Sequence, residues 1–519
     1  MVIKARIRRN TYFDSITLIK IARTLTGMDG VEDAAAIMAT EANLQLLQEA
    51  GLTPFEGSAG AADVLFVVRA SDEGSAEAAL QSAEEQLAQR LVTTSDGGAN
   101  SGPQQPRSLE KALQIDPEAS LAVISVPGPY AALEADRALR NGLHVFLFSD
   151  NVPLEDEFAL KRLAQERGLL LMGPDCGTAM LNGVGLGFVN VVRNGPIGTV
   201  GASGTGIQQV MSLIAHLGSG VSQVIGSGGR DLSEEVGAIT TLQGLRLLQE
   251  DEETEVIVLV SKPPAPAVAE RVLEAAVQGK KPVIVIFVGA DHDALERRYG
   301  NRVVVTRTLA EAARKAVSVC GGTEMTTGTW HVSKVKPVRP VEKPRVKTMT
   351  LSALYSGGTL CDEAMHLWAE QLGPIYSNIP LKPEWRLVES GQRVKGHCAI
   401  DFGADEYTRG RPHPMIDPSL RLRRLQEEAS NPAVGVILLD IVLGYCSHPD
   451  PASVYAPAIL AALRQAKQEG RPLTFIISLC GTEGDPQRLS TQSAKFRNAG
   501  AEVFTSNADA ALRCIEVIL

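Results

Sequence analysis

The sequence predicts an α/β protein with parallel sheets, divided into several domains. Short apolar segments rich in Val and Ile alternate with segments whose apolar residues recur at helical spacing. This alternation is typical of β-α-β units, in which the helices cross over between parallel strands. The chain of 519 residues is long enough for about three or four domains of ordinary size.

Residues 1–92 predict a small α/β domain in which each of the strands is followed by a helix. The expected strands are VIKARIR, VEDAAAIM and DVLFVV, and the expected helices cover residues 12–25, 41–50 and 75–91. The stretch TTSDGGANSGPQQPR follows them and lacks apolar periodicity. Its Gly, Ser, Pro and Gln residues favour an irregular linker, which we expect over residues 93–116.

The alternation of strands and helices resumes beyond this linker. The segments LAVISV, HVFLFS and LLLMG, with intervening helices, predict a parallel sheet within residues 117–193. Residues 195–320 repeat the pattern with IGTV, QVIGSG, VIVLVS, PVIVIFVG and RVVVT as strands. A Pro- and Lys-rich stretch indicates a second linker over 321–347, and residues 348–519 begin again with the strand TMTLSALYS.

The loop GASGTG connects a strand directly to a helix. The first N–H groups of a helix lack partners within the helix, and its dipole is positive at this end, so such a loop stabilises an anion without a basic side chain. Glycines let the backbone approach the anion, and hydroxyls add donors. The candidate phosphate ligands are Ser203, Gly204, Thr205 and Gly206. The alternative is an ordinary βα turn that needs glycine for its geometry.

A second copy of this unit occurs later in the chain. YSGGTLCDEAM again joins a strand to a helix through a Gly-Thr loop, and it places Thr359 opposite Thr205. The downstream segments LRLLQEDEETEVIVLV and LRRLQEEASNPAVGVILLD also match. A turn needs only to reverse the chain, so the recurrence favours anion binding and adds Gly357, Gly358 and Thr359 to the candidate phosphate ligands.

Loops at the carboxyl ends of parallel strands line the ligand crevice in open sheets, so they supply the candidate catalytic residues. SKPPAPA contains Lys262, which is suited to clamping an anion. GRPHPMIDP and GYCSHPDP contain His413 and His448, candidates for general acid or base near neutral pH. The alternative for each histidine is a surface or capping residue. Cys361 is expected in the first turn of a helix, where a thiol pKa falls, but we interpret it as a packed thiol rather than a nucleophile.

Composition excludes several functional classes. The formal net charge is −10, and no block of Lys or Arg indicates a nucleic-acid or anionic-membrane surface. No run of apolar residues is long enough for a membrane span or a signal peptide, so we expect a cytoplasmic protein. Seven cysteines occur without a C-x-x-C pair, so neither disulfides nor a metal site is expected.

Several segments resemble known enzymes. LLLMGPDCGTAML followed by IGTVGASGTGIQQV resembles the α subunit of succinyl-CoA synthetase, and residues 348–519 resemble the carboxyl-terminal ligase domain of that enzyme's β subunit. With NTYFDS, MATEAN, SKPPAPA and PHPMIDP, the whole chain resembles the FdrA family of the acyl-CoA synthetase superfamily.

The resemblance implies a Rossmann-like CoA-binding-type domain at 117–193 and flavodoxin-like ligase-type domains at 195–320 and 348–519, after the small N-terminal α/β domain. It also implies that the two Gly-rich helix termini face each other across a phosphate. The residues that it points to as CoA-binding-like are Pro127, Gly173, Pro174, Asp175 and Cys176.

The chain departs from the synthetases at their phosphohistidine. The loop that carries it there is short here, ADHDALERRYGN, and we interpret His292 within it as a solvated loop residue. Ser261 and Lys262 stand where the synthetases have a glutamate. We therefore do not expect a nucleotide to phosphorylate a histidine of this chain. Asp175 replaces an asparagine of the family, and its carboxylate repels a phosphate-bearing ligand.

Resemblance to the FdrA family implies oxamate carbamoyltransferase of allantoin (purine) breakdown, with carbamoyl passing between oxamate and phosphate. One alternative is an acyl-CoA synthetase that uses CoA, and another is a non-catalytic subunit that senses CoA or an anion. The expected ligands are phosphate and a small carboxylate or carbamoyl compound, with CoA under the alternatives. The expected assembly is a hetero-oligomer with other subunits or a homodimer, without nucleic acid or membrane.

Overall fold

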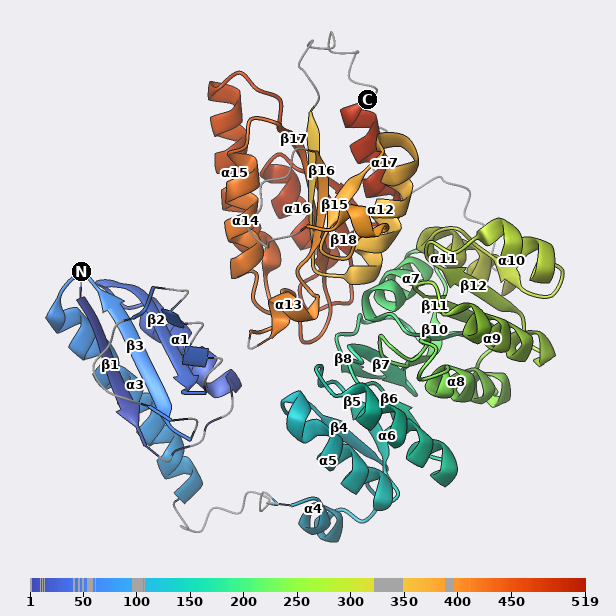
Figure 1. The fold of residues 1–519 in the computed structure, drawn as a ribbon, viewed down its shortest axis with the longest axis horizontal. Helices are drawn as coiled ribbons and strands as arrows, with labels where there is room; N and C mark the ends of the chain where they lie inside the picture. The colour runs from blue at the N-terminus through green and yellow to red at the C-terminus, as the bar shows by residue number, and fades with distance from the viewer. Residues whose placement is uncertain are drawn as a thin grey trace. The chain divides into compact units, whose positions relative to one another are not determined.

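The computed structural model describes residues 2–9, 11, 13, 15–40, 43–44, 47–48, 51–53, 59–60, 62–95, 106, 108–321, 349–387, 396–409 and 411–519 (Figure 1). The chain forms two compact units, residues 1–105 and 106–519. Within the described residues, no helix combines the length and the apolar character needed to span a bilayer.

The first unit contains a three-stranded antiparallel sheet in the order β1-β3-β2. Its elements are β1 (Val2–Arg8), α1 (Ser15–Thr26), β2 (Val31–Met38), β3 (Val64–Ala70) and α3 (Glu73–Ser95). Leu18, Phe66 and Leu80 are buried together, because α1 and α3 pack against the sheet. The predicted strands are confirmed. The helix predicted at 41–50 lies largely outside the described residues.

The second unit begins with a small parallel sheet in the order β4-β5-β6. Its elements are α4 (Leu109–Ile115), β4 (Leu121–Ile124), α5 (Gly128–Arg140), β5 (His144–Leu147), α6 (Leu154–Arg167) and β6 (Leu171–Met172). The Ser108 hydroxyl accepts a hydrogen bond from the Lys111 N–H and begins α4. With α3 ending at Ser95, helices extend into both ends of the segment expected as a linker.

The next sheet has seven strands in the order β13-β12-β11-β9-β10-β7-β8. The elements are β7 (Thr178–Leu181), β8 (Val184–Gly187), β9 (Ile197–Gly201), α7 (Gly204–His216), β10 (Val221–Gly226), α8 (Ile239–Glu250), β11 (Val256–Ser261), α9 (Pro266–Gln278), β12 (Val283–Phe287), α10 (His292–Tyr299), β13 (Val304–Val305) and α11 (Leu309–Val319). The strands from β9 to β13 are parallel, as predicted, and the hairpin β7–β8 adds antiparallel to β10.

The last sheet has six parallel strands in the order β15-β16-β14-β17-β18-β19. The elements are β14 (Thr350–Tyr355), α12 (Gly358–Leu372), β15 (Ile375–Ser377), the 3-10 helix η1 (Pro383–Trp385), β16 (His397–Asp401), α13 (Asp405–Thr408), α14 (Ser419–Ala429), β17 (Val434–Val442), α15 (Pro451–Gln468), β18 (Thr474–Cys480), α16 (Leu489–Asn498), β19 (Glu502–Phe504) and α17 (Asn507–Ile518).

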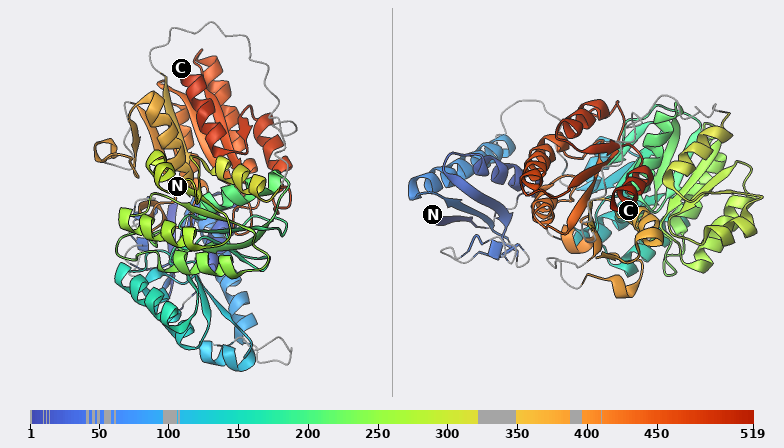
Figure 2. Two further views of the ribbon diagram at one scale, coloured as in Figure 1. Left: turned by 90° about the vertical axis from the view of Figure 1, so that its right-hand side faces the viewer. Right: turned by 90° about the horizontal axis from the view of Figure 1, so that it is seen from above.

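The two larger sheets share one hydrophobic core. Helices α7 and α11 of one sheet contact α12 and α17 of the other, and all four lie between the sheets in Figures 1 and 2. Ile207 and Met211 on α7 are fully buried in the same cluster as Met365 and Trp368 on α12. This packing brings the N-termini of α7 and α12, which follow the repeated Gly-Thr loops, close to each other.

Candidate functional site

The two Gly-Thr loops meet through a direct hydrogen bond. Ser203 is the N-cap of α7, where its Oγ accepts from the Gly206 N–H at 3.1 Å. The same hydroxyl donates to Thr359 Oγ1 at 2.7 Å, and both side chains are buried. Because the Thr359 hydroxyl accepts this bond, its own hydrogen remains to be donated to a ligand. The structure thus brings the predicted phosphate ligands of both copies together.

The glycines of the loops allow this close approach. A Cβ atom added to Gly357 would lie 2.6 Å from Thr205 Oγ1, and one added to Gly206 would lie 3.1 Å from the Thr359 methyl group. No side chain caps α12, whose N-cap is Gly357. The first N–H groups of α12 therefore remain free of a side-chain acceptor at the point where the two loops meet.

A buried carboxylate fixes the backbone of the second loop. Asp440 on β17 accepts from the Ser356 N–H at 2.7 Å and from the Gly357 N–H at 2.9 Å, and Arg421 on α14 donates to it at 2.8 Å. Burial raises the pKa of Asp440, while Arg421 and the amide donors favour its ionised form. Sequence reasoning missed both residues. The signal was an aspartate inside the apolar segment VGVILLDIVL.

Lys262 lies beside the first residue of α12. A Cβ atom added to Gly358 would be 3.2 Å from Lys262 Nζ and 2.7 Å from Asp401 Oδ2. Burial raises the pKa of Asp401 to about 6, with the positive charge of Lys262 acting in the opposite direction. Burial also raises the pKa of Asp362, again opposed by Lys262. Among the described residues, Lys262 has no ion pair within 4.0 Å, so its ammonium is available to an anion at the α12 terminus.

The two candidate histidines lie on loops that hydrogen-bond to each other. The His448 N–H donates to the Met415 carbonyl at 2.7 Å, and its Nδ1 accepts from the Asp450 N–H at 3.1 Å. His413 packs against Phe188, with ring centroids 5.4 Å apart. Burial lowers the pKa of His413 to about 4, and the charge of Arg421 adds to this effect. His413 is therefore neutral at neutral pH, so it does not act there as an imidazolium acid.

The CoA-binding-like residues gather at the carboxyl ends of β4, β5 and β6. Ser149 joins them, because its Oγ donates to the Val126 carbonyl at 2.5 Å and its carbonyl accepts from the Asp175 N–H at 2.9 Å. Pro127 is the N-cap of α5. Gly173 and Pro174 form a cis peptide. Cys176 is buried, and its Sγ donates to the Gly226 carbonyl at 3.4 Å, so it packs inside the unit.

The charges around Asp175 are mostly negative, so the phosphate groups of a bound CoA would have to lie away from this carboxyl group. The charged groups that act on its carboxyl include Asp150, Asp405 and Arg230. A phosphate placed there would meet more carboxylates than cations, and like charges at close range repel. The loops that contain Ser203 and Thr359 differ in offering helix N–H donors and Lys262 to a phosphate, beside the carboxyl groups of Asp401 and Asp362.

One expectation drawn from the sequence is wrong, and the interpretation of Cys361 as a packed thiol is confirmed. His292 is not a solvated loop residue: it begins α10, is half-buried, and hydrogen-bonds through Nε2 to the Phe287 carbonyl at 3.0 Å. Cys361 is in the first turn of α12, but its thiol is fully buried. Burial raises the pKa of Cys361 well above its ordinary value and outweighs the helix terminus, so this thiol is a packed one.

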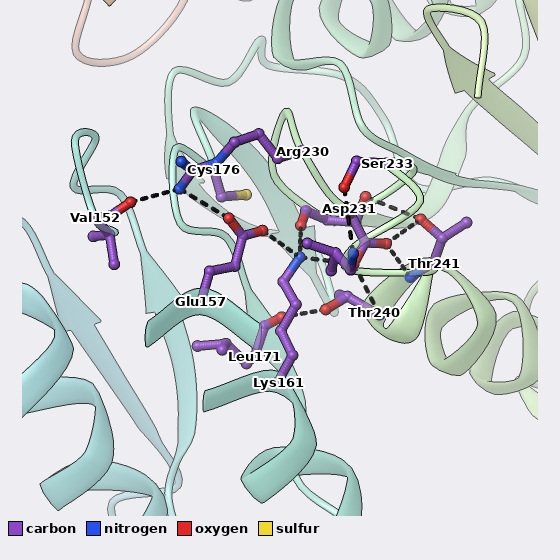
Figure 3. Close-up of polar contacts among 12 residues, drawn as sticks. Val152, Glu157, Lys161, Leu171, Cys176, Arg230, Asp231, Ser233, Thr240 and Thr241 are labelled. Atoms are coloured by element: carbon purple, nitrogen blue, oxygen red, sulfur yellow. Dashed lines mark hydrogen bonds and ion pairs between the residues drawn. The ribbon is translucent and has the colours of Figure 1, made fainter. Parts of the chain in front are cut away.

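A buried charge network ties α6 to the loop after β10 (Figure 3). Lys161 Nζ lies 2.7 Å from Asp231 Oδ1 and 3.1 Å from Glu157 Oε1. Asp231 also accepts from the Thr241 N–H at the start of α8, and Arg230 pairs with Glu157 at 2.9 Å. Removing one member would leave a buried charge without its partner. The network therefore fastens the three-stranded sheet and its helices to the seven-stranded sheet.

Two models of known domains define the class of protein, and they match the parts of the chain that contain the paired loops. A CoA-ligase model matches residues 354–517, and a CoA binding domain model matches residues 192–289, which include the first Gly-Thr loop. A third model, described as "AllF, heavy metal-associated domain", matches residues 1–104. The chain thus has the domains of acyl-CoA synthetase-like proteins together with a distinct N-terminal domain.

Relatives define the family. The protein YahF of Escherichia coli (strain K12) is 43% identical over 523 residues, which cover 100% of this chain and 99% of YahF. The chain belongs to the FdrA family. Subunit alpha 2 of the ADP-forming succinate–CoA ligase of Archaeoglobus fulgidus is 31% identical over 159 residues, 30% of this chain and 54% of that subunit. The apo dinucleotide-forming acetyl-coenzyme A synthetase 1 of Ca. Korarchaeum cryptofilum aligns over 83% of this chain and 92% of its own, with 16% identity and a TM-score of 0.35.

The N-terminal domain lacks thiolate and imidazole ligands. Neither cysteine nor histidine occurs before His144, and the soft ligands of residues 1–104 are the thioethers of Met1, Met28 and Met38. Zinc sites are built from thiolate and imidazole. Despite the description of its family, residues 1–104 therefore do not fit a metal site of the cysteine or histidine type.

Proposed function

We propose that the chain is a subunit of a group-transfer enzyme that holds one phosphate group between the N-termini of α7 and α12. The observation that carries this proposal is the 2.7 Å hydrogen bond between Ser203 and Thr359. It joins the N-termini of α7 and α12 at one point, where the first N–H groups of a helix lack partners within the helix. Lys262 adds a positive charge beside the second terminus. Such an arrangement stabilises the negative charge of a phosphate and of a transition state formed on it.

The reaction that the domains support best is that of an acid–thiol ligase, in which an acyl group passes between a phosphate oxygen and the thiol of CoA. CoA would supply that thiol. The chain's own residues would bind and orient the phosphate through Thr205, Thr359 and Lys262. Asp401, whose pKa of about 6 lies close to neutrality, stands beside Gly358 and is suited to exchanging a proton there.

A second candidate is carbamoyl transfer between oxamate and phosphate in allantoin breakdown. It is favoured by His292, whose imidazole is engaged with the Phe287 carbonyl. It is also favoured by Ser261 and Lys262, which stand in place of a glutamate that would orient a phosphohistidine. A reaction that uses free phosphate needs no phosphorylated protein side chain.

Two assays on the full chain, assembled with the subunits that co-purify with it, test these candidates. The first measures release of free thiol from an acyl-CoA in the presence of phosphate. The second measures formation of carbamoyl phosphate from carbamoyl-oxamate and phosphate. Thr205→Ala and Thr359→Ala should each reduce the activity that is found, and exposed Thr491 on α16 provides the control variant Thr491→Ala.

Each outcome of these assays has a distinct meaning. Thiol release supports ligation, and carbamoyl phosphate formation supports carbamoyl transfer. Phosphate binding without either activity would support the sensing role instead. If the complex neither binds phosphate nor catalyses either reaction, the proposal is wrong.

A further inference from the structure

The imidazole of His413 is held in one orientation by its neighbours. Its Nδ1 accepts a hydrogen bond from the Met415 N–H at 3.3 Å. The buried ring of Phe188 packs against it, with the centroids 5.4 Å apart and the planes inclined by 44°. His413 lies on the loop between α13 and α14, whereas Phe188 follows β8. Two distant parts of the chain therefore fix this ring.

This arrangement determines which ring nitrogen of His413 is a donor. A neutral imidazole has one N–H and one acceptor nitrogen. Burial and the charge of Arg421 lower the pKa of His413 to about 4, so the ring is neutral at neutral pH. Because Nδ1 accepts from Met415, the proton is on Nε2. Within the described part of the chain no group accepts from Nε2–H, and His413 is only partly buried, so this donor is available to a ligand.

The Nε2–H donor lies beside the second Gly-Thr loop. A Cβ atom added to Gly403 would be 2.9 Å from His413 Nε2 and 3.2 Å from Asp401 Oδ1. It would also be 2.5 Å from the carbonyl oxygen of Ser356, which directly precedes the loop glycines. The other oxygen of Asp401 would be 2.7 Å from a Cβ atom added to Gly358, the first residue of α12. One carboxyl group thus stands between His413 and the N-terminus of α12.

We propose that His413 contacts the substrate and donates from Nε2 to the carbonyl oxygen of the group that is transferred to or from phosphate. The inference rests on the proposed function and applies to both candidate reactions, because an acyl group and a carbamoyl group each have a carbonyl oxygen. Attack on the carbonyl carbon forms a bond to the nucleophile and moves an electron pair of the C=O bond onto this oxygen. The pair returns when the bond to the leaving group breaks. A fixed N–H donor stabilises the negative charge that develops in between.

A neutral imidazole suits this task. It donates a hydrogen bond to the oxygen and keeps its proton throughout, as a neutral histidine does when it polarises a carbonyl group. An imidazolium in the same place would be opposed by burial and by the charge of Arg421. Asp401 and His413 then have separate tasks, because the carboxyl group exchanges a proton while the imidazole binds the oxygen.

The test compares two phosphonates on the full chain. Acetonylphosphonate resembles an acyl phosphate in which a CH2 group replaces the bridging oxygen, and propylphosphonate has the same chain without the carbonyl oxygen. In calorimetry the wild type should bind acetonylphosphonate about two- to tenfold more tightly than propylphosphonate, as expected for one hydrogen bond. His413→Asn should abolish this preference. The affinity for inorganic phosphate should stay unchanged, because the phosphate ligands are intact.

Two amide substitutions separate contact with the ligand from a structural role. The amide of His413→Asn reaches the position of Nδ1 and keeps an acceptor for the Met415 N–H, but it provides no donor at Nε2. The amide of His413→Gln provides an N–H near Nε2 and gives up the bond to Met415. His413→Gln should therefore retain more of the preference for acetonylphosphonate, whereas thermal unfolding should show His413→Asn to be the more stable variant.

A second histidine provides the matched control. The Nδ1 of half-buried His397, at the start of β16, also accepts a backbone N–H, that of Leu351 at 3.0 Å. His397→Asn should keep the full preference for acetonylphosphonate. In whichever assay detects activity, His413→Asn should lower kcat about a hundred- to a thousandfold and leave the KM for phosphate unchanged, as expected for the loss of one donor to a developing oxyanion.

The outcomes distinguish this inference from the proposed function. If the wild type binds neither phosphate nor the phosphonates, the proposed function fails. If it binds them but the preference for acetonylphosphonate is absent, or survives in His413→Asn, the role of His413 is wrong while the phosphate site stands. A preference that is retained better in His413→Asn than in His413→Gln would likewise overturn the inference, because it would follow the bond to Met415.

Discussion

The two Gly-Thr loops occupy equivalent places in the repeat but are fixed in different ways. In the first, the Ser203 hydroxyl caps α7 from within the loop. In the second, Gly357 stands at the N-cap, and the carboxylate of Asp440 holds the loop backbone from the neighbouring strand. Val200 of β9 pairs with Leu259 of β11, and at the equivalent place of the second copy Leu354 of β14 pairs with Leu439 of β17. The next residue of the partner strand is Val260 in the first copy and Asp440 in the second.

The two copies of the duplicated unit therefore hold equivalent loops by different means. The first loop needs no charge behind it, so its strand stays apolar. The second loop is connected through Asp440 to Arg421 on α14, so it depends on a buried ion pair.

The largest effect is expected for Asp440→Ala. The substitution leaves Arg421 buried without its carboxylate and frees the Ser356 and Gly357 N–H groups, which should cost about 3–5 kcal/mol of stability. Urea unfolding of the full chain measures it. Val260→Ala at the equivalent place should cost less, because no charge is involved. Equal losses in the two variants would contradict the contrast between the loops.

The next effect is a pH dependence that comes from Asp401 beside the second loop. Its pKa is raised from 3.8 to about 6 in the folded state, so the folded chain binds this proton more tightly than the unfolded chain. Stability should therefore fall as pH rises from about 4 to about 6, by at most about 3 kcal/mol. Asp401→Asn should lack this loss. Unfolding at several pH values measures it, with the exposed Asp405→Asn as control. Parallel pH profiles for wild type and Asp401→Asn would refute the assignment.

Gly357→Ala should cost about 1–3 kcal/mol, since the added Cβ would overlap the Thr205 side chain and overpack the contact between the loops. Thr205→Ala in the same chain should recover part of the loss. Gly204→Ala in the first loop has room, with its nearest neighbour Thr178 Oγ1 at 3.4 Å, and should be tolerated. Thermal unfolding provides the comparison. A Gly204→Ala variant as damaged as Gly357→Ala would show that the loops are not packed as described.

The smallest effect is the coupling between Ser203 and Thr359. Ser203→Ala should cost more than Thr359→Ala, because it removes the cap of α7 as well as the hydrogen bond between the loops. A double-mutant cycle on unfolding free energies should give a coupling of about 0.5–1.5 kcal/mol. Strict additivity would mean that the two hydroxyls do not interact in solution.

Local patterns predicted much of the fold. The strands, the repeat and the Gly-Thr loops follow from apolar periodicity and from glycine at helix starts, which are properties of neighbouring residues. The hairpin β7–β8 was missed although its signal is present. Asn182 and Gly183 both have positive φ at its turn, and Asn-Gly between apolar segments favours such a turn.

The rest of the site depends on contacts between distant parts of the chain. Nothing near Asp440 in the sequence indicates that Arg421 on another element pairs with it. His413 was a candidate general acid or base from its position, but burial by other elements lowers its pKa to about 4 and leaves it neutral at neutral pH. Pairing and burial are set by packing, and the sequence pattern around one residue does not report them.

The central claim is that both loops hold one phosphate, and phosphate affinity of Thr205→Ala, Thr359→Ala and the double variant tests it most directly. Each single variant loses a donor to a charged ligand and should bind phosphate about ten- to a hundred-fold more weakly in calorimetry. Because both donors serve one ligand, the double variant should depart from additivity. If folded single variants bind phosphate as tightly as the wild type, the loops are structural turns and the claim is contradicted.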